Sequence, residues 1–225
     1  MDSIQRLALQ IVPFFMAVIF HEVAHGWVAN QWGDSTAKDQ GRLTFNPMPH
    51  LDVVGTVILP VLMMSTGSGL LFGWAKPVPI DPSRFRKFRP GLFWVSAAGP
   101  LMNFLLATVS AFGFALMNRF LPESFSLSEP LVGMAYISVS LNFSLGIFNL
   151  LPIPPLDGSK IIESFLSYTA LRKYEALAQY GFWILLALLM TGALSILSSP
   201  ITFLTRLVLG FAISAVGLPA GGLTE

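Results

Sequence analysis

Long apolar stretches separated by short polar loops make up most of the chain. Residues 7–29, 92–117 and 131–151 are each long enough to cross a bilayer as a helix, which needs about 20 residues. Two further apolar stretches, 181–197 and 201–218, form a pair near the C-terminal end. The pattern predicts an all-α polytopic membrane protein with about five to six transmembrane helices, folded as a single membrane-embedded domain.

One apolar stretch, 51–71, does not fit a simple span. It is interrupted by Pro60 and by a Ser-Thr-Gly-Ser-Gly run, and its uninterrupted part, residues 53–64, is short for a crossing. We therefore expect a re-entrant segment here, with an additional full span as the alternative.

A strand-like piece, Gly41-Arg-Leu-Thr-Phe45, follows the first predicted helix. It predicts a short β element, and an ordinary connecting loop fits the same residues equally well. An extended element near an active site would allow a substrate to bind by strand addition.

Composition supports a membrane protein and limits the chemistry. The chain is 54% hydrophobic and 11% charged, with a mean hydropathy of +0.68. It contains no cysteine, so a bound metal would have to be held by histidine and carboxylate side chains. The net charge of +1, with its basic residues in short loops, gives no reason to expect a nucleic-acid partner.

The motif His21-Glu22-Val-Ala-His25 lies inside the first apolar stretch. Residues four apart share one face of a helix, so His21 and His25 can point at the same ion. Glu22 is placed to act as the general base of zinc-dependent hydrolysis. The histidines could instead fill a helix face by chance, but ionisable side chains at membrane depth are costly without a partner. The motif therefore predicts half of a zinc site.

A third ligand is expected after the stretch 131–151. Three prolines, Pro152, Pro154 and Pro155, unwind the end of this helix because proline cannot continue the hydrogen-bond ladder. Asp157 follows directly and is the candidate ligand. Its alternative role is to cap a helix that begins near Ser159.

A shared metal would also fix the topology. If 51–71 crossed the membrane fully, the helices at 7–29 and 131–151 would run in opposite directions, which would separate His21 from Asp157. A re-entrant segment places both near one surface. The basic residues on that side are Lys38, Arg42, Lys76, Arg84, Arg86, Lys87, Arg89, Lys160, Arg172 and Lys173, against Arg6 and Arg119 opposite. By the positive-inside rule, the site opens toward the cytoplasm.

Three motifs together resemble the site-2 protease family of intramembrane zinc metalloproteases. They are F-H-E-x-x-H-G at 20–26, A-G-P-x-x-N at 98–103 and N-x-x-P-x-P-x-L-D-G at 149–158. The resemblance covers most of the chain. We see neither an inserted PDZ-like domain nor a C-terminal nucleotide-sensing domain in this sequence, so we expect it to resemble the minimal core of the family.

The resemblance implies a function and a set of site residues. One Zn²⁺ per chain would be bound by His21, His25 and Asp157, with Glu22 as the catalytic base. Asn149 matches a family asparagine that helps to bind the substrate backbone or the oxyanion. The protein would lie in the plasma or inner membrane, in contact with lipid, and would cleave the transmembrane segments of other proteins.

Two alternatives remain at this point, a membrane metal transporter and a non-catalytic scaffold that binds transmembrane segments. A transporter needs no general base, and the intact Glu22 argues against a silent scaffold. His50, the remaining histidine, could line a water channel or brace a loop. The sequence gives no information on the oligomeric state.

Overall fold

The computed structural model describes residues 3–58, 76–122 and 124–218, and all regular elements in these ranges are helical. The α-helices are α1 (Ser3–Trp32), α2 (Thr36–Asp39), α4 (Phe88–Phe120), α5 (Ser128–Asn149), α6 (Asp157–Glu163), α7 (Tyr168–Ala178), α8 (Gly181–Met190) and α9 (Ser198–Ala215). Short helical turns cover Met48–His50, Val53–Ile58, Pro82–Arg84 and Ala193–Leu197. The predicted all-α class is confirmed.

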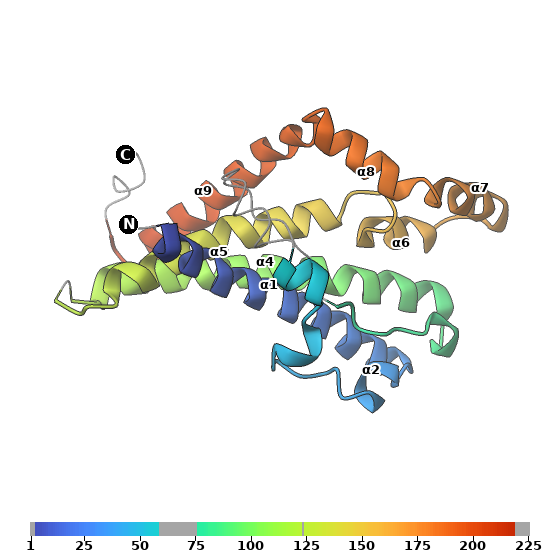
Figure 1. Cartoon of the computed structure of the whole chain (residues 1–225), viewed down its shortest axis with the longest axis horizontal. Helices are drawn as coiled ribbons and strands as arrows, with labels where there is room; N and C mark the ends of the chain where they lie inside the picture. Colours follow the sequence, from blue (N-terminus) through green and yellow to red (C-terminus); the bar gives the residue numbers. More distant parts are fainter. Residues whose placement is uncertain (1–2, 59–75, 123, 219–225) are drawn as a thin grey trace.

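Helices α1, α4 and α5 pack on one another and form the centre of the molecule (Figure 1). Helices α1 and α5 run in the same direction, and α4 runs in the opposite direction (Figure 1). This is the arrangement that a metal shared between the motif on α1 and the residues after α5 requires. The predicted direction of these helices is confirmed.

Small residues let the helices approach closely. Ala107, Ala111 and Ala115 recur every four residues along one face of α4, and all three are fully buried. This face belongs to the same buried cluster as Phe143 of α5 and Leu209 of α9. In lipid, helix association depends on such close packing because apolar side chains gain little by leaving the membrane.

Four helical stretches are long and apolar enough to cross a membrane in the part of the chain that the structure describes. They are Leu9–Trp32, Phe88–Phe120, Ser128–Asn149 and Ala193–Ala215. The prediction of five to six spans is therefore not confirmed.

The predicted span 181–197 is wrong as a continuous helix. Helix α8 ends at Met190 after 10 residues, about 15 Å, which is short of the roughly 30 Å apolar core of a bilayer. Gly192 follows with a backbone φ of +71°, a conformation that ends a helix. The chain then continues through a short helical turn into α9.

The short β element is also not confirmed. Residues 41–45 are described, and they form an irregular segment after α2 with no strand beside them among the described residues. Gly41 has a φ of +66°, so the chain turns there instead of extending. Most of the predicted re-entrant segment 51–71 lies outside the described residues; only its beginning, the helical turn Val53–Ile58, is seen.

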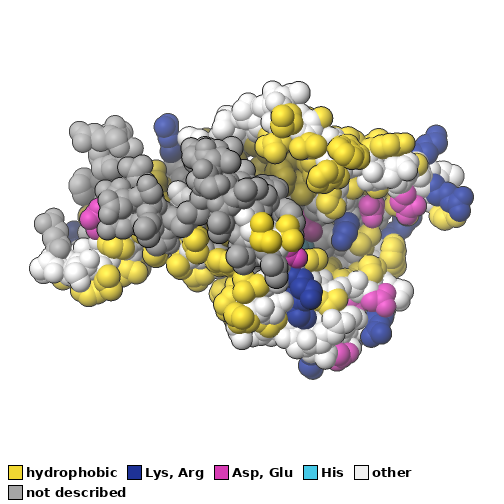
Figure 2. All heavy atoms as spheres, viewed as in Figure 1, with side chains coloured by type: hydrophobic (Ala, Val, Ile, Leu, Met, Phe, Trp, Pro, Cys, Tyr) yellow, Lys and Arg dark blue, Asp and Glu magenta, His cyan; other side chains and the backbone are white. Residues whose placement is uncertain are grey.

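Charged side chains gather at one end of the molecule. Figure 2 shows that most Lys, Arg, Asp and Glu side chains on this face lie near α2, α6 and α7. Hydrophobic side chains are prominent over the remainder of the described surface in this view (Figure 2). The C-terminal ends of α1 and α5 point toward the charged end (Figure 1).

We expect a larger side chain in the buried face of α9 to destabilise the fold. Ala212 is fully buried, whereas Ala215 on the same helix is exposed. Ala212→Leu should lower the free energy of unfolding by about 1–3 kcal/mol because the added atoms have no space. Ala215→Leu is the matched control and should change it by less than about 0.5 kcal/mol. Thermal unfolding in detergent measures both, and equal stability of the two variants would contradict the packing.

Candidate metal centre

Helix α1 presents two imidazoles at one point in the protein interior. His21 and His25 are one helical turn apart, and their side chains are almost fully buried. Their Nε2 atoms lie 3.0 Å from each other, and the ring planes are inclined by 82°. The spacing read from the sequence therefore brings both rings to one point.

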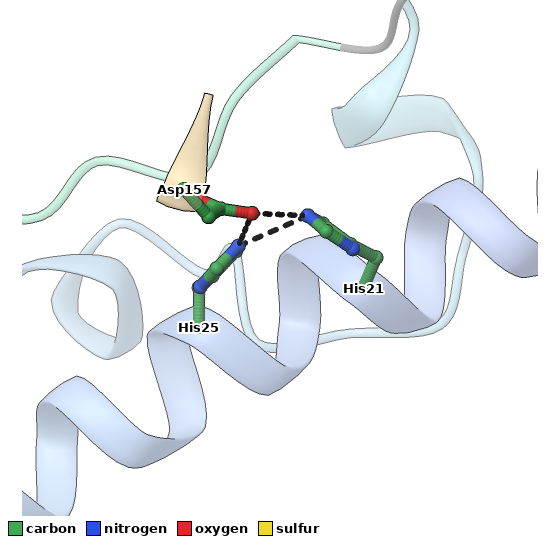
Figure 3. Close-up of side chains that lie close together, drawn as sticks. All are labelled: His21, His25 and Asp157. Carbon is green, nitrogen blue, oxygen red and sulfur yellow. Dashed lines mark hydrogen bonds and ion pairs between the residues drawn. The ribbon is translucent and has the colours of Figure 1, made fainter. Parts of the chain in front are cut away.

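Asp157 meets this pair from the other side (Figure 3). Its Oδ2 lies 3.1 Å from His21 Nε2 and 3.3 Å from His25 Nε2. Asp157 is the first residue of α6, and the N-cap position belongs to Leu156. Its carboxylate therefore points at the histidines and does not cap the helix, which decides against the alternative role.

The loop before Asp157 is irregular, as its prolines predict. Residues 150–156 lie between α5 and α6, and the hydroxyl of Tyr174 donates a 2.9 Å hydrogen bond to the carbonyl of Pro152. A side chain at Gly158 would collide with the backbone of Leu150, so glycine is required directly after the aspartate. As a metal ligand Asp157 would act in its ionised carboxylate form.

The outer nitrogens of both imidazoles are already engaged. His25 Nδ1 lies 2.6 Å from the carbonyl oxygen of Val95, and His21 Nδ1 lies 2.6 Å from Asn103 Oδ1. Because both partners are oxygen acceptors, each Nδ1 carries a proton. In a neutral ring this leaves a lone pair on Nε2, which faces the other ring and Asp157. This is the tautomer in which histidine binds a metal.

The three inward-facing atoms fit a zinc ion. Two atoms bound to a tetrahedral zinc at its usual distances lie about 3.3 Å apart, and the three pairs here are separated by 3.0, 3.1 and 3.3 Å. Lone pairs and a carboxylate oxygen this close repel one another unless a positive charge lies between them. Asp157 Oδ2 is buried and has no hydrogen-bond donor among the described residues. The set of two nitrogens and one oxygen is typical of a catalytic zinc site with one open position.

Helix α4 closes one side of the cluster. A Cβ atom at Gly99 would overlap the Nε2 atoms of both histidines, so the bare backbone of α4 lies directly against the imidazoles. In the sequence, Gly99 and Asn103 belong to the motif A-G-P-x-x-N at 98–103, which does not by itself place them at the metal cluster. The signal that could have placed them here is a Gly-Pro pair and an asparagine within an otherwise apolar span, which indicates close backbone approach and an internal polar contact.

Glu22 is held by a segment that is distant in the sequence. Its Oε2 accepts a 2.7 Å hydrogen bond from the backbone N–H of Val78. Arg42 secures the same segment, because its Nη2 donates to the carbonyls of Lys76 at 2.8 Å and Pro77 at 3.2 Å. No local pattern in the sequence could have predicted this contact, since the partners are 56 residues apart.

His50 braces this loop. Its Nε2 lies 2.9 Å from the carbonyl oxygen of Thr44, and its own carbonyl accepts a hydrogen bond from the N–H of Lys76. The ring is almost completely buried. Of the two roles considered for His50, the contacts support loop bracing.

Among the described residues, Asn149 makes no hydrogen bond to His21, His25 or Asp157. Its Nδ2 donates a 3.0 Å hydrogen bond to the carbonyl of Leu145, one turn earlier in α5. The residue is only partly buried and ends the helix.

Comparison with known proteins identifies relatives of this chain. Residues 123–191 match the group described as Peptidase family M50. The chain is 39% identical over 197 residues to YwhC of Bacillus subtilis (strain 168), covering 85% of this chain and 86% of that protein. It is 29% identical over 187 residues to Rip2 of Mycolicibacterium smegmatis, covering 83% and 68% of the two chains. It is 24% identical over 190 residues to MJ0392 of Methanocaldococcus jannaschii, covering 84% and 44%. No solved structure matches.

The names of these relatives agree with a metal site formed by His21, His25 and Asp157. The term "zinc metalloprotease" is part of the name of each of the three proteins. The names do not favour the alternatives of a metal transporter or a non-catalytic scaffold, and they imply zinc as the metal for a cluster of His21, His25 and Asp157. The similarity to YwhC extends over most of both chains. The protein therefore belongs to peptidase family M50 and is an intramembrane zinc metalloprotease of the site-2 protease type.

Proposed function

We propose that this protease hydrolyses peptide bonds within the transmembrane segments of other membrane proteins. In this proposal His21, His25 and Asp157 hold the zinc ion and Glu22 is the catalytic base. The observation that carries the proposal is the approach of two histidine Nε2 atoms and one aspartate Oδ2 to within 3.3 Å of one another, among helices that are long and apolar enough to span a membrane.

When bound, zinc supplies a Lewis acid that makes water a stronger nucleophile near neutral pH and polarises a carbonyl. Glu22 takes the proton from the attacking water and passes it to the nitrogen of the leaving amine. Its Oε2 is occupied by the N–H of Val78, while Oε1 accepts no hydrogen bond from the described residues. The Val78 contact therefore fixes the carboxylate and leaves Oε1 to carry the proton.

Asn149 is proposed to contact the substrate. Its position at the end of α5, before the loop that carries Asp157, supports this role. The side-chain amide now donates to Leu145, so it would have to exchange this bond for one to the substrate backbone or to the oxyanion. The residue would thus act only after a substrate is bound.

The site is proposed to open toward the cytoplasm. The charge bias of the loops supports this, because the basic residues gather on the side of the motifs. The protein would then be a multi-pass protein of the plasma or inner membrane. Cleavage at this depth requires a substrate helix to unwind, since a helical backbone hides its peptide carbonyls.

We expect Glu22→Gln to retain zinc and to abolish cleavage. Glutamine is close in shape to glutamate but cannot take a proton, so the metal cluster should persist while hydrolysis falls by about 100-fold or more. Zinc content of the purified protein and a comparison of membrane-protein fragments in cells measure the two effects. Glu129→Gln, an exposed residue in the first turn of α5, is the control and should cleave normally. Proteolysis retained in Glu22→Gln would remove Glu22 as the base.

We expect Asp157→Ala to lose zinc. Two imidazoles alone leave the cluster without its negative charge, so the zinc content should fall from one per chain toward zero after dialysis against a weak chelator. Asp39→Ala removes an exposed carboxylate of α2 and serves as the control. An unchanged zinc content in Asp157→Ala would exclude this residue from the ligand set.

A further inference from the structure

A chain of buried amide groups leads away from His21 through the membrane-spanning helices. Asn103 of α4 faces the His21 ring, and its Nδ2 lies 3.0 Å from Oδ1 of Asn142 on α5. Asn142 Nδ2 donates in turn to Ser138, to the carbonyl at 2.9 Å and to the hydroxyl at 3.1 Å. Asn103 is 0% exposed and Asn142 is 1% exposed. Polar groups buried at this depth are costly, which makes a structural or functional role for the pair the default expectation.

Two backbone carbonyls set the direction of this chain. A carbonyl oxygen can only accept a hydrogen bond, so each amide must turn its NH₂ group toward the carbonyl beside it. The carbonyl of Ala17 lies 3.3 Å from Asn103 Nδ2, and the carbonyl of Ser138 lies 2.9 Å from Asn142 Nδ2. Asn142 must then offer its oxygen to Asn103, and Asn103 must offer its oxygen to His21. The orientation of both amides follows from these contacts.

The orientation of Asn103 decides the tautomer of His21. With its oxygen toward the ring, it accepts the Nδ1 proton and leaves a lone pair on Nε2, which faces Asp157 (Figure 3). With the amide reversed, its N–H would need a lone pair on Nδ1, and the proton would move to Nε2. A protonated Nε2 cannot bind a metal.

The two histidines differ in how their tautomers are fixed. The Nδ1 of His25 faces the backbone carbonyl of Val95, which cannot be reversed. The Nδ1 of His21 faces a side-chain amide, which can rotate by half a turn unless its neighbours prevent it. Ala17 O contacts Asn103 at a longer 3.3 Å, so the 3.0 Å bond to Asn142 is the stronger restraint.

We propose that Asn142 is a positioning residue of the zinc site. It holds the amide of Asn103 with its oxygen toward His21, and through Asn103 it keeps His21 in the tautomer that binds zinc. Its side-chain hydrogen bonds go to Asn103 and Ser138, and none goes to His21, His25 or Asp157 among the described residues, so it acts through Asn103. The inference rests on the proposed role of His21 as a ligand.

The test is a measurement of histidine tautomers in zinc-free protein. The chain contains three histidines, so protein labelled with ¹⁵N in its histidine rings gives a spectrum of only three imidazoles. Ring ¹⁵N chemical shifts distinguish a proton on Nδ1 from one on Nε2. We use about pH 9, well above the usual histidine pKa of about 6.5, so that the rings are neutral. In the wild-type chain we expect His21 to carry its proton on Nδ1; a proton on Nε2 would overturn the proposal without any variant.

Asn142→Leu removes the restraint on Asn103. We expect His21 to become a mixture of tautomers while His25 and His50 stay unchanged, and the zinc affinity to fall by about 10- to 100-fold in a chelator competition. Asn118→Leu makes the same change on α4, where the asparagine is exposed and bonds to its own helix, and should have neither effect. If Asn142→Leu keeps a single Nδ1–H tautomer and wild-type affinity, the proposal is wrong.

A second variant separates this role from general packing. Aspartate at position 103 carries two acceptor oxygens, so neither orientation can offer an N–H to His21. The double variant Asn103→Asp with Asn142→Leu should therefore restore a single Nδ1–H tautomer and most of the zinc affinity. If the double variant still shows mixed tautomers and reduced zinc affinity, Asn142 matters only for packing. Zinc retained in Asp157→Ala would instead contradict the ligand set, which is a different result from any of these.

Discussion

The structure depends on one requirement, that side chains from two separate parts of a membrane protein reach one point inside it. His21 and His25 come from α1, whereas Asp157 follows α5, more than a hundred residues later in the sequence. Their inward atoms can approach to within 3.3 Å only if α1 and α5 run in the same direction. The requirement also explains the irregular segment after α5, because a continuing helix would carry Asp157 past the histidines.

Burying these groups is costly, and the surrounding helices reduce the cost by supplying partners for every outward-facing nitrogen. Helix α4 does this twice, with the backbone of Val95 and the side chain of Asn103, and its glycine allows the approach that makes both contacts possible. Among the inward-facing atoms, Asp157 Oδ2 is left without a hydrogen-bond donor among the described residues. A protein interior tolerates such an arrangement only where a cation completes it. The hydrogen bonds around the site thus select the metal-binding form of each ligand before a metal arrives.

The sequence predicted the parts of this structure that follow from local chemistry. The four-residue spacing of the histidines, the prolines before Asp157 and the shared direction of α1 and α5 could all be argued from single motifs and one geometric condition. Two predictions, the β element at 41–45 and the continuous span 181–197, were wrong because the chain turns at a glycine. Gly41 and Gly192 adopt positive φ, which ended the expected β element and divided the expected span 181–197. The contacts of Glu22 with Val78 and of Asn103 with Asn142 join distant residues, and no local pattern records such pairs.

The segment that holds Glu22 has a consequence for how a substrate can bind. Pro77 and Pro79 have no backbone N–H. The N–H of Lys76 donates to the carbonyl of His50, and the N–H of Val78 donates to Glu22. The carbonyls of Lys76 and Pro77 accept hydrogen bonds from Arg42. From Lys76 to Pro79 the backbone thus has no donor left for a polypeptide laid along it. An unwound substrate must therefore find donors for its own backbone carbonyls elsewhere around the zinc site.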